Sequence, residues 1–246
     1  MIRIPRPPLP VDLAGHLAAL AEKVTATGVQ FHHAEARRLW ELNTTRSRVR
    51  NPIRAALCAM APGDEQCMYC GEVGTDIEHF EPVARNPLRT FDWLNHLLAC
   101  STCNSHKRDQ FPVGEGDQPL LIDPTIEDPF DHLQLALSEG VYAALSDKGE
   151  TTIAVCNLNR PQLTRARKWS RGNAEICLRQ WAVAYRDGDE PLMREVVRTV
   201  QEQPCADVCQ AMLREAEGVN ANIIFEAKPD VLTLLRRPEL REALLS

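Results

Sequence analysis

The stretch that decides the fold is CMYCGEVGTDIEHFEPVARNPLRTFDWLNHLLACSTCNSHKRDQFP, residues 67–112. It carries two CxxC pairs, Cys67 with Cys70 and Cys100 with Cys103. Each pair can chelate a metal from a tight turn, and two such pairs complete a tetrahedral four-thiolate zinc site. A closed thiolate shell leaves no position for water, so we predict a structural zinc rather than four unrelated core cysteines. The metal would stabilise a segment too polar and too short to form its own core.

The other five cysteines show no such spacing. They are scattered through apolar or helical contexts, and nine cysteines in total is an odd number. Paired CxxC spacing favours metal over disulfides in a reducing compartment, and isolated thiols there are usually small core residues. We therefore predict core positions for Cys58, Cys156, Cys177, Cys205 and Cys209.

Three short motifs accompany the cysteine pairs. EHFEP lies at 78–82, WLN at 93–95, and CNSHK at 103–107. This pattern resembles the HNH endonucleases, in particular those whose ββα-metal motif is supported by a four-cysteine zinc site. The resemblance implies a mainly α protein with a small ββα-metal (HNH) core and the structural zinc, α+β overall.

The resemblance also implies roles for individual residues. Glu78 and Asn104 would hold one divalent ion, Mg²⁺ or Mn²⁺, while His79 acts as general base and Asn95 orients it. Many family members have Asp before the histidine, so here the longer carboxylate of Glu78 must reach the ion. The chemistry agrees, because a neutral histidine with a pKa of about 6.5 can take a proton from water, and hard cations prefer oxygen ligands.

The second cysteine pair is expected on a helix over residues 96–107. Cys100 and Cys103 would then share one face for zinc, with Asn104 about 100° further round the axis. Lys107 would lie on the Asn104 face, where it either contacts a phosphate as a catalytic-site residue or is a solvated lysine at the helix end.

Two further histidines lie close to this segment. We expect neither His96 nor His106 to take part in catalysis.

The rest of the chain divides by pattern. Apolar residues at helical spacing predict helices over 11–42, with a break at Gly28, and again from 161 onward. Val141–Leu145 and Thr151–Val155 are β-prone runs that predict a hairpin. The expected regions are a helical segment with a basic cluster (1–60), the nuclease core with its zinc site (61–135) and a hairpin and basic helix (136–171). The last region is helical (172–246) and is either a partner interface, which we favour, or core packing for the helical frame.

Charge is distributed unevenly. The formal net charge is −6, with +5 over residues 1–60, −11 over 61–160, +4 over 161–171 and −4 over the remainder. If nucleic acid binds, the basic flanks must contact its backbone or a partner must supply that contact. Each of two clusters is either a solvated helix face or a DNA-backbone contact: Arg46, Arg48, Arg50 and Arg54; and Arg165, Arg167, Lys168 and Arg171.

Composition excludes several classes of protein. Hydrophobic residues make up 44% and charged residues 25% of 246 residues, as in ordinary globular proteins and unlike disordered chains or fibres. No apolar run reaches the roughly 18 to 20 residues of a membrane helix. Prolines interrupt the N-terminus where a signal peptide needs an apolar stretch, so we expect a cytoplasmic protein without membrane association.

The resemblance extends past the motif. FPVGEGDQPLLIDPTIEDPFDHL (111–133) and TIAVCNLNRPQLTRAR (152–167) resemble a bacterial subgroup that contains the HNH component of the Septu anti-phage system, the PtuB-like proteins, and retron-associated nucleases. The similarity runs roughly from residue 40 to 170. It implies a nuclease, most simply one acting on DNA, in a defence complex with an ABC-type ATPase.

Two other functions compete with this hypothesis. The chain could be a zinc-stabilised scaffold with an inactive HNH centre that recruits partners through its helical C-terminal half. Retention of Glu78, His79, Asn95 and Asn104 argues against it. A transcription-factor-like zinc module is disfavoured by the acidic centre and by the absence of a basic recognition helix beside the cysteines.

Overall fold

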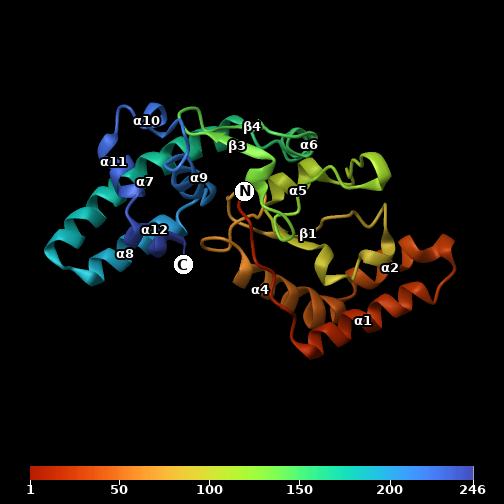
Figure 1. The fold of residues 1–246 in the computed structure, drawn as a ribbon. Coiled ribbons are helices and arrows are strands. Elements are labelled where there is room, and N and C mark those ends of the chain that lie inside the picture. The colour runs from red at the N-terminus through yellow and green to blue at the C-terminus, as the bar shows by residue number, and fades with distance from the viewer. Residues whose placement is uncertain (246) are drawn as a thin grey trace.

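The computed structural model describes residues 1–245 and is mainly helical, with two small antiparallel sheets. The N-terminal helices lie at one end of the molecule and the C-terminal helices at the other, with the strands between them (Figure 1). The longer elements are α1 (Val11–Thr25), α2 (His32–Glu41), α4 (Asn51–Met60), β1 (Asp76–His79), β2 (His96–Ala99), α5 (Ser101–Lys107), β3 (Leu133–Ala136), β4 (Val141–Ala144), α6 (Asp147–Cys156), α7 (Pro161–Asp187), α8 (Glu190–Glu202), α9 (Asp207–Glu215), α11 (Pro229–Leu235) and α12 (Pro238–Leu245). Short helical turns complete the chain: α3 (Asn43–Thr45), α10 (Ala221–Ile224), a π-helical turn at Arg46–Arg50, and 3-10 turns at Val29–Phe31, Pro87–Arg89, Trp93–Asn95, Glu115–Asp117 and Pro129–Asp131.

The cysteine-bearing centre folds in the order β1, β2, α5. The two strands are antiparallel, with Ile77 opposite Leu98 and His79 opposite His96. All four residues of β2 are buried, which suits an apolar run covered on both faces. The predicted helix over 96–107 is therefore wrong in its first half.

The helix begins only after Cys100. The Cys100 Sγ accepts a hydrogen bond from the Cys103 backbone N at 3.4 Å, and this bond caps the first turn of α5. Cys100 thus precedes the helix instead of sharing a helical face with Cys103. A short apolar run such as Leu97–Ala99 fits either a helix or a strand by its pattern alone.

The predicted hairpin is also wrong. β4 covers Val141–Ala144 as expected, but its partner is β3, with Leu135 opposite Tyr142. The run expected as the second strand lies in α6. Ser146 caps this helix by accepting from the Gly149 N at 3.2 Å. A Cβ at Gly149 would come within 2.0 Å of the His132 carbonyl O, so only glycine allows this approach.

The N-terminal helices follow the prediction. α1 buries Leu13, Leu17, Leu20 and Val24 along one face, and the chain breaks near Gly28 before α2 begins. α2 packs beside the turn at Pro87–Arg89, and its Trp40 ring contacts His79, the last residue of β1. This end of the molecule therefore borders the segment that carries the motif residues.

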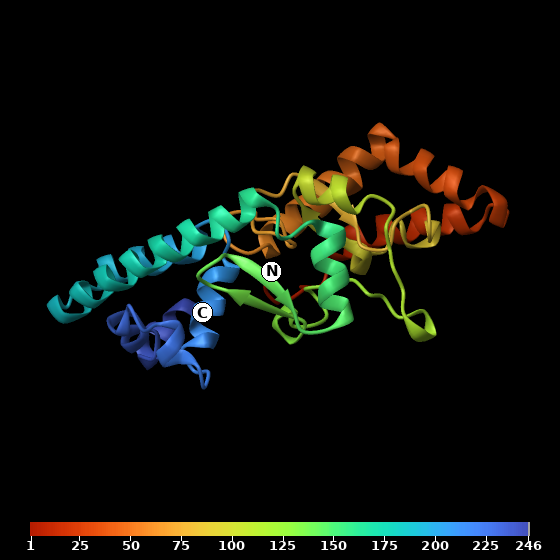
Figure 2. The same ribbon diagram turned by 90° about the horizontal axis from the view of Figure 1, so that it is seen from above.

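The C-terminal helices pack along α7. α8, α9 and α11 all contact this 27-residue helix, and Figure 2 shows it along one edge with the last helices to one side. Pro191 lies in the first turn of α8, and Pro204 lies before α9, whose first residue is Asp207.

The scattered cysteines are core residues, as predicted. Cys156, Cys205 and Cys209 are buried, while Cys58 and Cys177 are partly buried against the core. Among residues 1–245, no helix combines the length and apolar character needed to cross a membrane.

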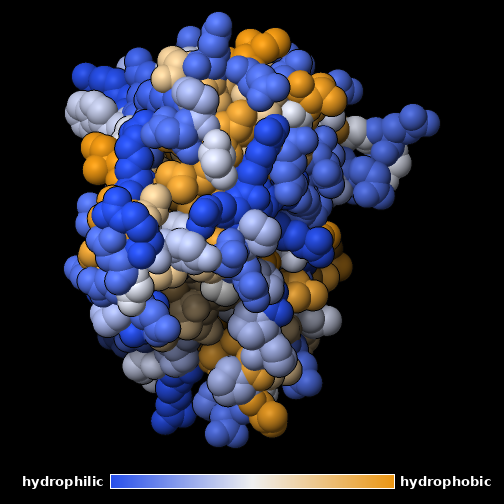
Figure 3. Space-filling model, turned by 60° about the vertical axis from the view of Figure 1, so that its left-hand side comes forward, coloured by the Kyte–Doolittle hydropathy of each residue, from blue (hydrophilic) through white to orange (hydrophobic). Residues whose placement is uncertain are grey.

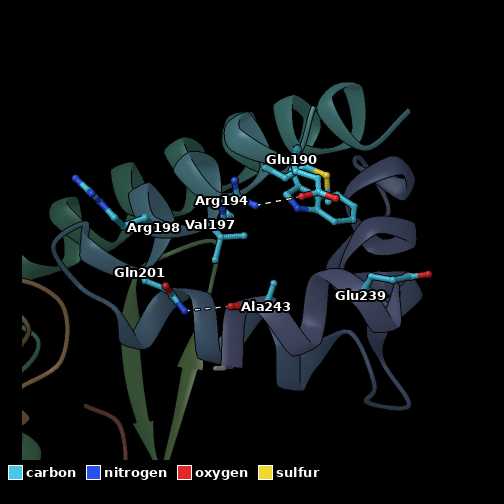
Figure 4. Close-up of a pocket in the computed structure, with 9 residues that line it drawn as sticks. Glu190, Arg194, Val197, Arg198, Gln201, Glu239 and Ala243 are labelled. Atoms are coloured by element: carbon cyan, nitrogen blue, oxygen red, sulfur yellow. Dashed lines mark hydrogen bonds and ion pairs between the residues drawn. The ribbon is translucent and has the colours of Figure 1, made fainter. Parts of the chain in front are cut away.

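A pocket of about 420 Å³ opens among α7, α8 and α12 (Figure 4). Trp181 and Val197 contribute apolar surface to it, and Arg194 pairs with Glu190 at 3.3 Å beside it. None of the predicted site residues lines this pocket.

Candidate functional site

The four paired cysteines meet in one buried cluster. Their sulfur atoms all lie within 4.8 Å of one another, and Cys70 Sγ is 3.6 Å from Cys100 Sγ. A tetrahedral zinc with bonds of about 2.3 Å separates its sulfur ligands by about 3.8 Å. The cluster therefore has the ligand type, number and spacing that zinc requires, and it can hold that ion.

A tight turn shapes the first pair. Cys67 N donates to Glu72 O at 2.6 Å, and Gly71 N donates to Cys67 O at 2.9 Å. Gly71 has φ +78°, and a Cβ there would lie 2.9 Å from the Cys205 Cα. The left-handed backbone and the close approach both favour glycine directly after the second ligand.

Arg160 contacts the cysteine cluster from the start of α7. Its guanidinium nitrogens lie 3.5 Å from Cys70 Sγ and 3.7 Å from Cys103 Sγ, and Glu72 Oε2 holds the same group at 2.6 Å. Four thiolates around Zn²⁺ carry a net charge of −2, so a buried cation beside them offsets part of that charge. Sequence reasoning missed Arg160, because it lies 57 residues beyond the last ligand.

Replacing Arg160 with methionine should loosen the zinc. Loss of a residue that contacts the ligands from outside typically costs about 10- to 100-fold in metal affinity. We expect faster transfer of zinc from Arg160→Met to a chromogenic chelator than from the wild type. Arg165→Met, an exposed change on the same helix, is the control. Equal release rates for both variants would exclude this role for Arg160.

His79 is held in one tautomer. Its Nε2 lies 3.1 Å from the Thr90 carbonyl O, which can only accept, so Nε2 carries the proton. Nδ1 keeps its lone pair, and no group within the described chain donates to it. Burial lowers the His79 pKa to about 4, which leaves the ring neutral near pH 7. The imidazole thus has the form that a general base needs.

Two aromatic rings surround His79. Trp40 meets it edge-on with ring centroids 4.7 Å apart, and His96 lies 4.9 Å away. His96 is buried, and its Nε2 also points at Thr90 O, at 3.0 Å. Burial lowers its pKa as well, so a neutral ring packs behind His79. Sequence reasoning did not find Trp40 or the Thr90 carbonyl, because neither has a motif of its own.

Asn95 fastens the loop between the strands. Its Oδ1 accepts from Glu81 N at 2.7 Å, and its Nδ2 donates to Glu81 O at 3.0 Å and Arg89 O at 3.1 Å. The side chain is fully buried and does not touch His79 directly. Its hydrogen bond to the Arg89 carbonyl holds the residue directly before Thr90, and the Thr90 carbonyl in turn orients the imidazole.

Glu78 and Lys107 form a buried ion pair. Glu78 Oε1 lies 2.5 Å from Lys107 Nζ, which also donates to the His79 carbonyl at 3.0 Å. Burial raises the Glu78 pKa to about 6, although Lys107 opposes the shift. The Lys107 side chain is fully buried, so the expectation of a solvated lysine at the helix end is wrong, and its contact with a phosphate stays a prediction.

Asn104 approaches β1 from α5. Its Nδ2 lies 3.4 Å from Asp76 Oδ2, which leaves its Oδ1 as the atom available to a cation. Asp76 and Glu78 are two apart on β1 and so face the same side of the strand. These oxygen donors suit Mg²⁺ or Mn²⁺, although Lys107 already neutralises Glu78. Sequence reasoning missed Asp76, for which the two-residue spacing from Glu78 was the available signal.

A cleft of about 400 Å³ opens beside His79. Val83, Ala84 and Asp109 line it from the central segment. The other wall belongs to α2, which supplies His33, Arg37, Trp40 and Glu41. The candidate base therefore borders a cavity that a substrate can enter.

The two basic clusters differ in exposure. Arg46 and Arg48 are exposed, whereas Arg50 lies over the Trp40 ring and Arg54 faces the Gly74 and Thr75 carbonyls. In the second cluster Arg165 and Lys168 are exposed.

The other two members of the second cluster are engaged. Arg171 pairs with Glu175 at 3.0 Å. Arg167 is buried, stacks on Tyr142 and lies 3.5 Å from Asp207. Arg167 therefore belongs to the core. It lies neither on a solvated helix face nor where it could contact a DNA backbone.

Comparison with known proteins finds similarity to a Septu protein. No family model matches the chain, and no solved structure matches it. Septu protein PtuB from Bacillus mycoides (strain KBAB4) is 30% identical over an alignment that covers 42% of this chain and 45% of the relative. The alignment thus covers less than half the length of either protein.

Proposed function

We propose that this protein is a metal-dependent HNH endonuclease that hydrolyses phosphodiester bonds of nucleic acid, DNA in the first place. We further propose that it works in the cytoplasm as the nuclease of a Septu-like anti-phage complex with an ABC-type ATPase. The observation that carries the proposal is His79, with Nε2 fixed on the Thr90 carbonyl and Nδ1 left unprotonated beside a cleft. The similarity to PtuB supports the defence role.

The reaction follows from this geometry. Nδ1 of His79 takes a proton from a water molecule, whose oxygen attacks the phosphorus as the bond to the leaving oxygen breaks. Thr90 O holds the ring in place and stabilises the imidazolium that forms. A divalent ion held by Glu78 and Asn104 would neutralise charge on the phosphate and the leaving oxygen. Asn95 and Lys107 keep the loop and the end of β1 in position.

Plasmid cleavage tests the proposal. Purified protein is incubated with supercoiled plasmid in Mg²⁺, in Mn²⁺ and in EDTA, each with and without the ABC-type ATPase proposed as its partner. We expect nicked or linear product with either ion in the presence of the ATPase, and none in EDTA. Absence of cleavage under all conditions would contradict the nuclease proposal.

One observation favours a second function. Lys107 forms a buried ion pair with Glu78, whose carboxylate the catalytic ion would need as a ligand. A zinc-stabilised scaffold with an inactive centre would tolerate this pair permanently. Such a protein forms the complex with the ATPase yet leaves the plasmid intact, which is the outcome that separates the two functions.

The partner surface is proposed on α7. Trp169, Ile176 and Val183 recur every seven residues, and the first two are 71% and 66% exposed. Gly172 lies between them with open space beyond its Cα, so a helix can approach closely. Figure 3 turns this half of the molecule forward and shows apolar patches among hydrophilic side chains. The spacing suits contact with a helix of the ATPase.

Placing aspartate at both Trp169 and Ile176 should abolish co-purification with the ATPase. Each anchor of an interface is worth about 2 kcal/mol, or roughly 30-fold in affinity. Ile223→Asp, a change at an equally exposed residue of α10, is the matched control. Retained binding by the double variant would exclude this face of α7.

A further inference from the structure

Helix α2 takes part in the candidate site although it lies outside the β1–β2–α5 segment. His33, Arg37 and Glu41 are four residues apart, which places them on one face of the helix. That face lines the cleft of about 400 Å³ that also contains His79. Trp40 fixes the distance between the helix and the histidine through its ring contact at 4.7 Å.

Arg37 is the residue of this wall best suited to bind an anion. Its guanidinium is always charged and presents a fork of donors that matches a phosphate. In the structure Arg37 pairs with Glu41 at 3.8 Å, and both side chains are exposed. Such a pair contributes little and yields readily to a better acceptor.

The cleft also contains carboxylates. Glu41 and Asp109 repel a phosphate, so they restrict where a nucleic-acid backbone can pass. Arg37 lies one turn before Glu41, and His33 one turn before Arg37. The section of the α2 wall that carries Arg37 and His33 is therefore the one at which a phosphodiester can be held.

We propose that Arg37, assisted by His33, binds a backbone phosphate of the strand whose scissile bond lies at His79. This inference rests on the proposed function and adds the residue that positions the substrate. It assigns α2 as part of the substrate-binding site, which the resemblance to HNH proteins does not provide.

Arg38 offers a matched control on the same helix. It is exposed to a similar degree, but it forms two hydrogen bonds of 2.7 Å with Glu35 and does not line the cleft. Because Arg37 and Arg38 carry the same charge one residue apart, any general electrostatic effect of removing an arginine from α2 affects both variants equally.

The test measures binding in the absence of cleavage. His79→Ala protein, with the ATPase present, is titrated into a fluorescein-labelled DNA duplex in Mg²⁺, and anisotropy is followed across salt concentrations. Adding Arg37→Ala should weaken binding about five- to eightfold at 0.1 M salt and lower the magnitude of the salt slope by about 0.7 to 0.9. Adding Arg38→Ala should change neither quantity.

The outcomes separate the two proposals. If the His79→Ala protein binds DNA and the Arg37 and Arg38 variants bind equally, the inference about α2 is wrong while the proposed function stands. If the His79→Ala protein binds no DNA, both proposals fail. In protein that retains His79, Arg37→Ala should also reduce kcat/KM by a similar factor, with Arg38→Ala unchanged.

Discussion

Replacing His79 with alanine should reduce DNA cleavage by about 10²- to 10⁴-fold, because that is the usual contribution of a general base. The variant should still bind zinc and fold, since His79 contributes ring contacts and one hydrogen bond to the structure and no ligand to the metal. Gel quantification of nicked and linear plasmid over time measures the loss, and elemental analysis measures the zinc.

The matched control is His106→Ala. His106 is an exposed histidine of α5, close in sequence to the second cysteine pair, but it does not line the cleft. Its replacement should leave cleavage within about twofold of the wild type, as expected for a surface change away from the chemistry. Cleavage by His79→Ala at the wild-type rate, in protein free of contaminating nucleases, would contradict the HNH proposal directly.

The parts of the site that carry a local pattern were predictable from sequence. The CxxC spacing predicted four cysteines in one cluster, and the cluster forms. Helical periodicity predicted α1 with its buried face. These features depend on residues near one another in the chain or on a ligand set whose chemistry is highly specific.

The parts that depend on tertiary contacts were not predictable. Leu97 and Leu98 form a strand because β1 lies beside them, and their own pattern fits a helix equally well. Arg160 reaches the cysteines through the fold, and the Thr90 carbonyl, as a backbone group, leaves no trace in the sequence. The burial of Lys107 likewise depends on the packing of α5 against β1, whereas its position near the end of a helix predicted exposure.

The buried Glu78–Lys107 pair has a consequence for how the proposed enzyme is controlled. A divalent ion that binds Glu78 must compete with an ammonium group 2.5 Å away. Breaking a buried pair is costly, because it leaves a charge without its partner. Binding of the ion and rearrangement of Lys107 are therefore coupled under the proposed function, so that one cannot occur without the other.

Loss of zinc should have the largest effect on the molecule as a whole. Structural zinc contributes about 10–16 kcal/mol of apparent binding free energy at neutral pH, which matches or exceeds the 5–15 kcal/mol total stability of a typical domain. We expect about one zinc per chain in purified protein, retained when Mg²⁺ is removed. Cys103→Ser should lose both zinc and solubility, because this ligand is fully buried.

Loss of zinc should also affect residues that contact the cysteine cluster from outside. Without zinc, the guanidinium of Arg160 faces protonated thiols instead of a −2 centre, so the start of α7 loses an electrostatic partner as well. Cys177→Ser is the control, since this partly buried cysteine lies outside the cluster and should keep zinc and fold. Folded wild-type protein without zinc would refute the structural role of the metal. A soluble, zinc-bound Cys103→Ser protein would show that three ligands suffice, because the turn at Gly71 and the cap at Cys100 already hold the others in place.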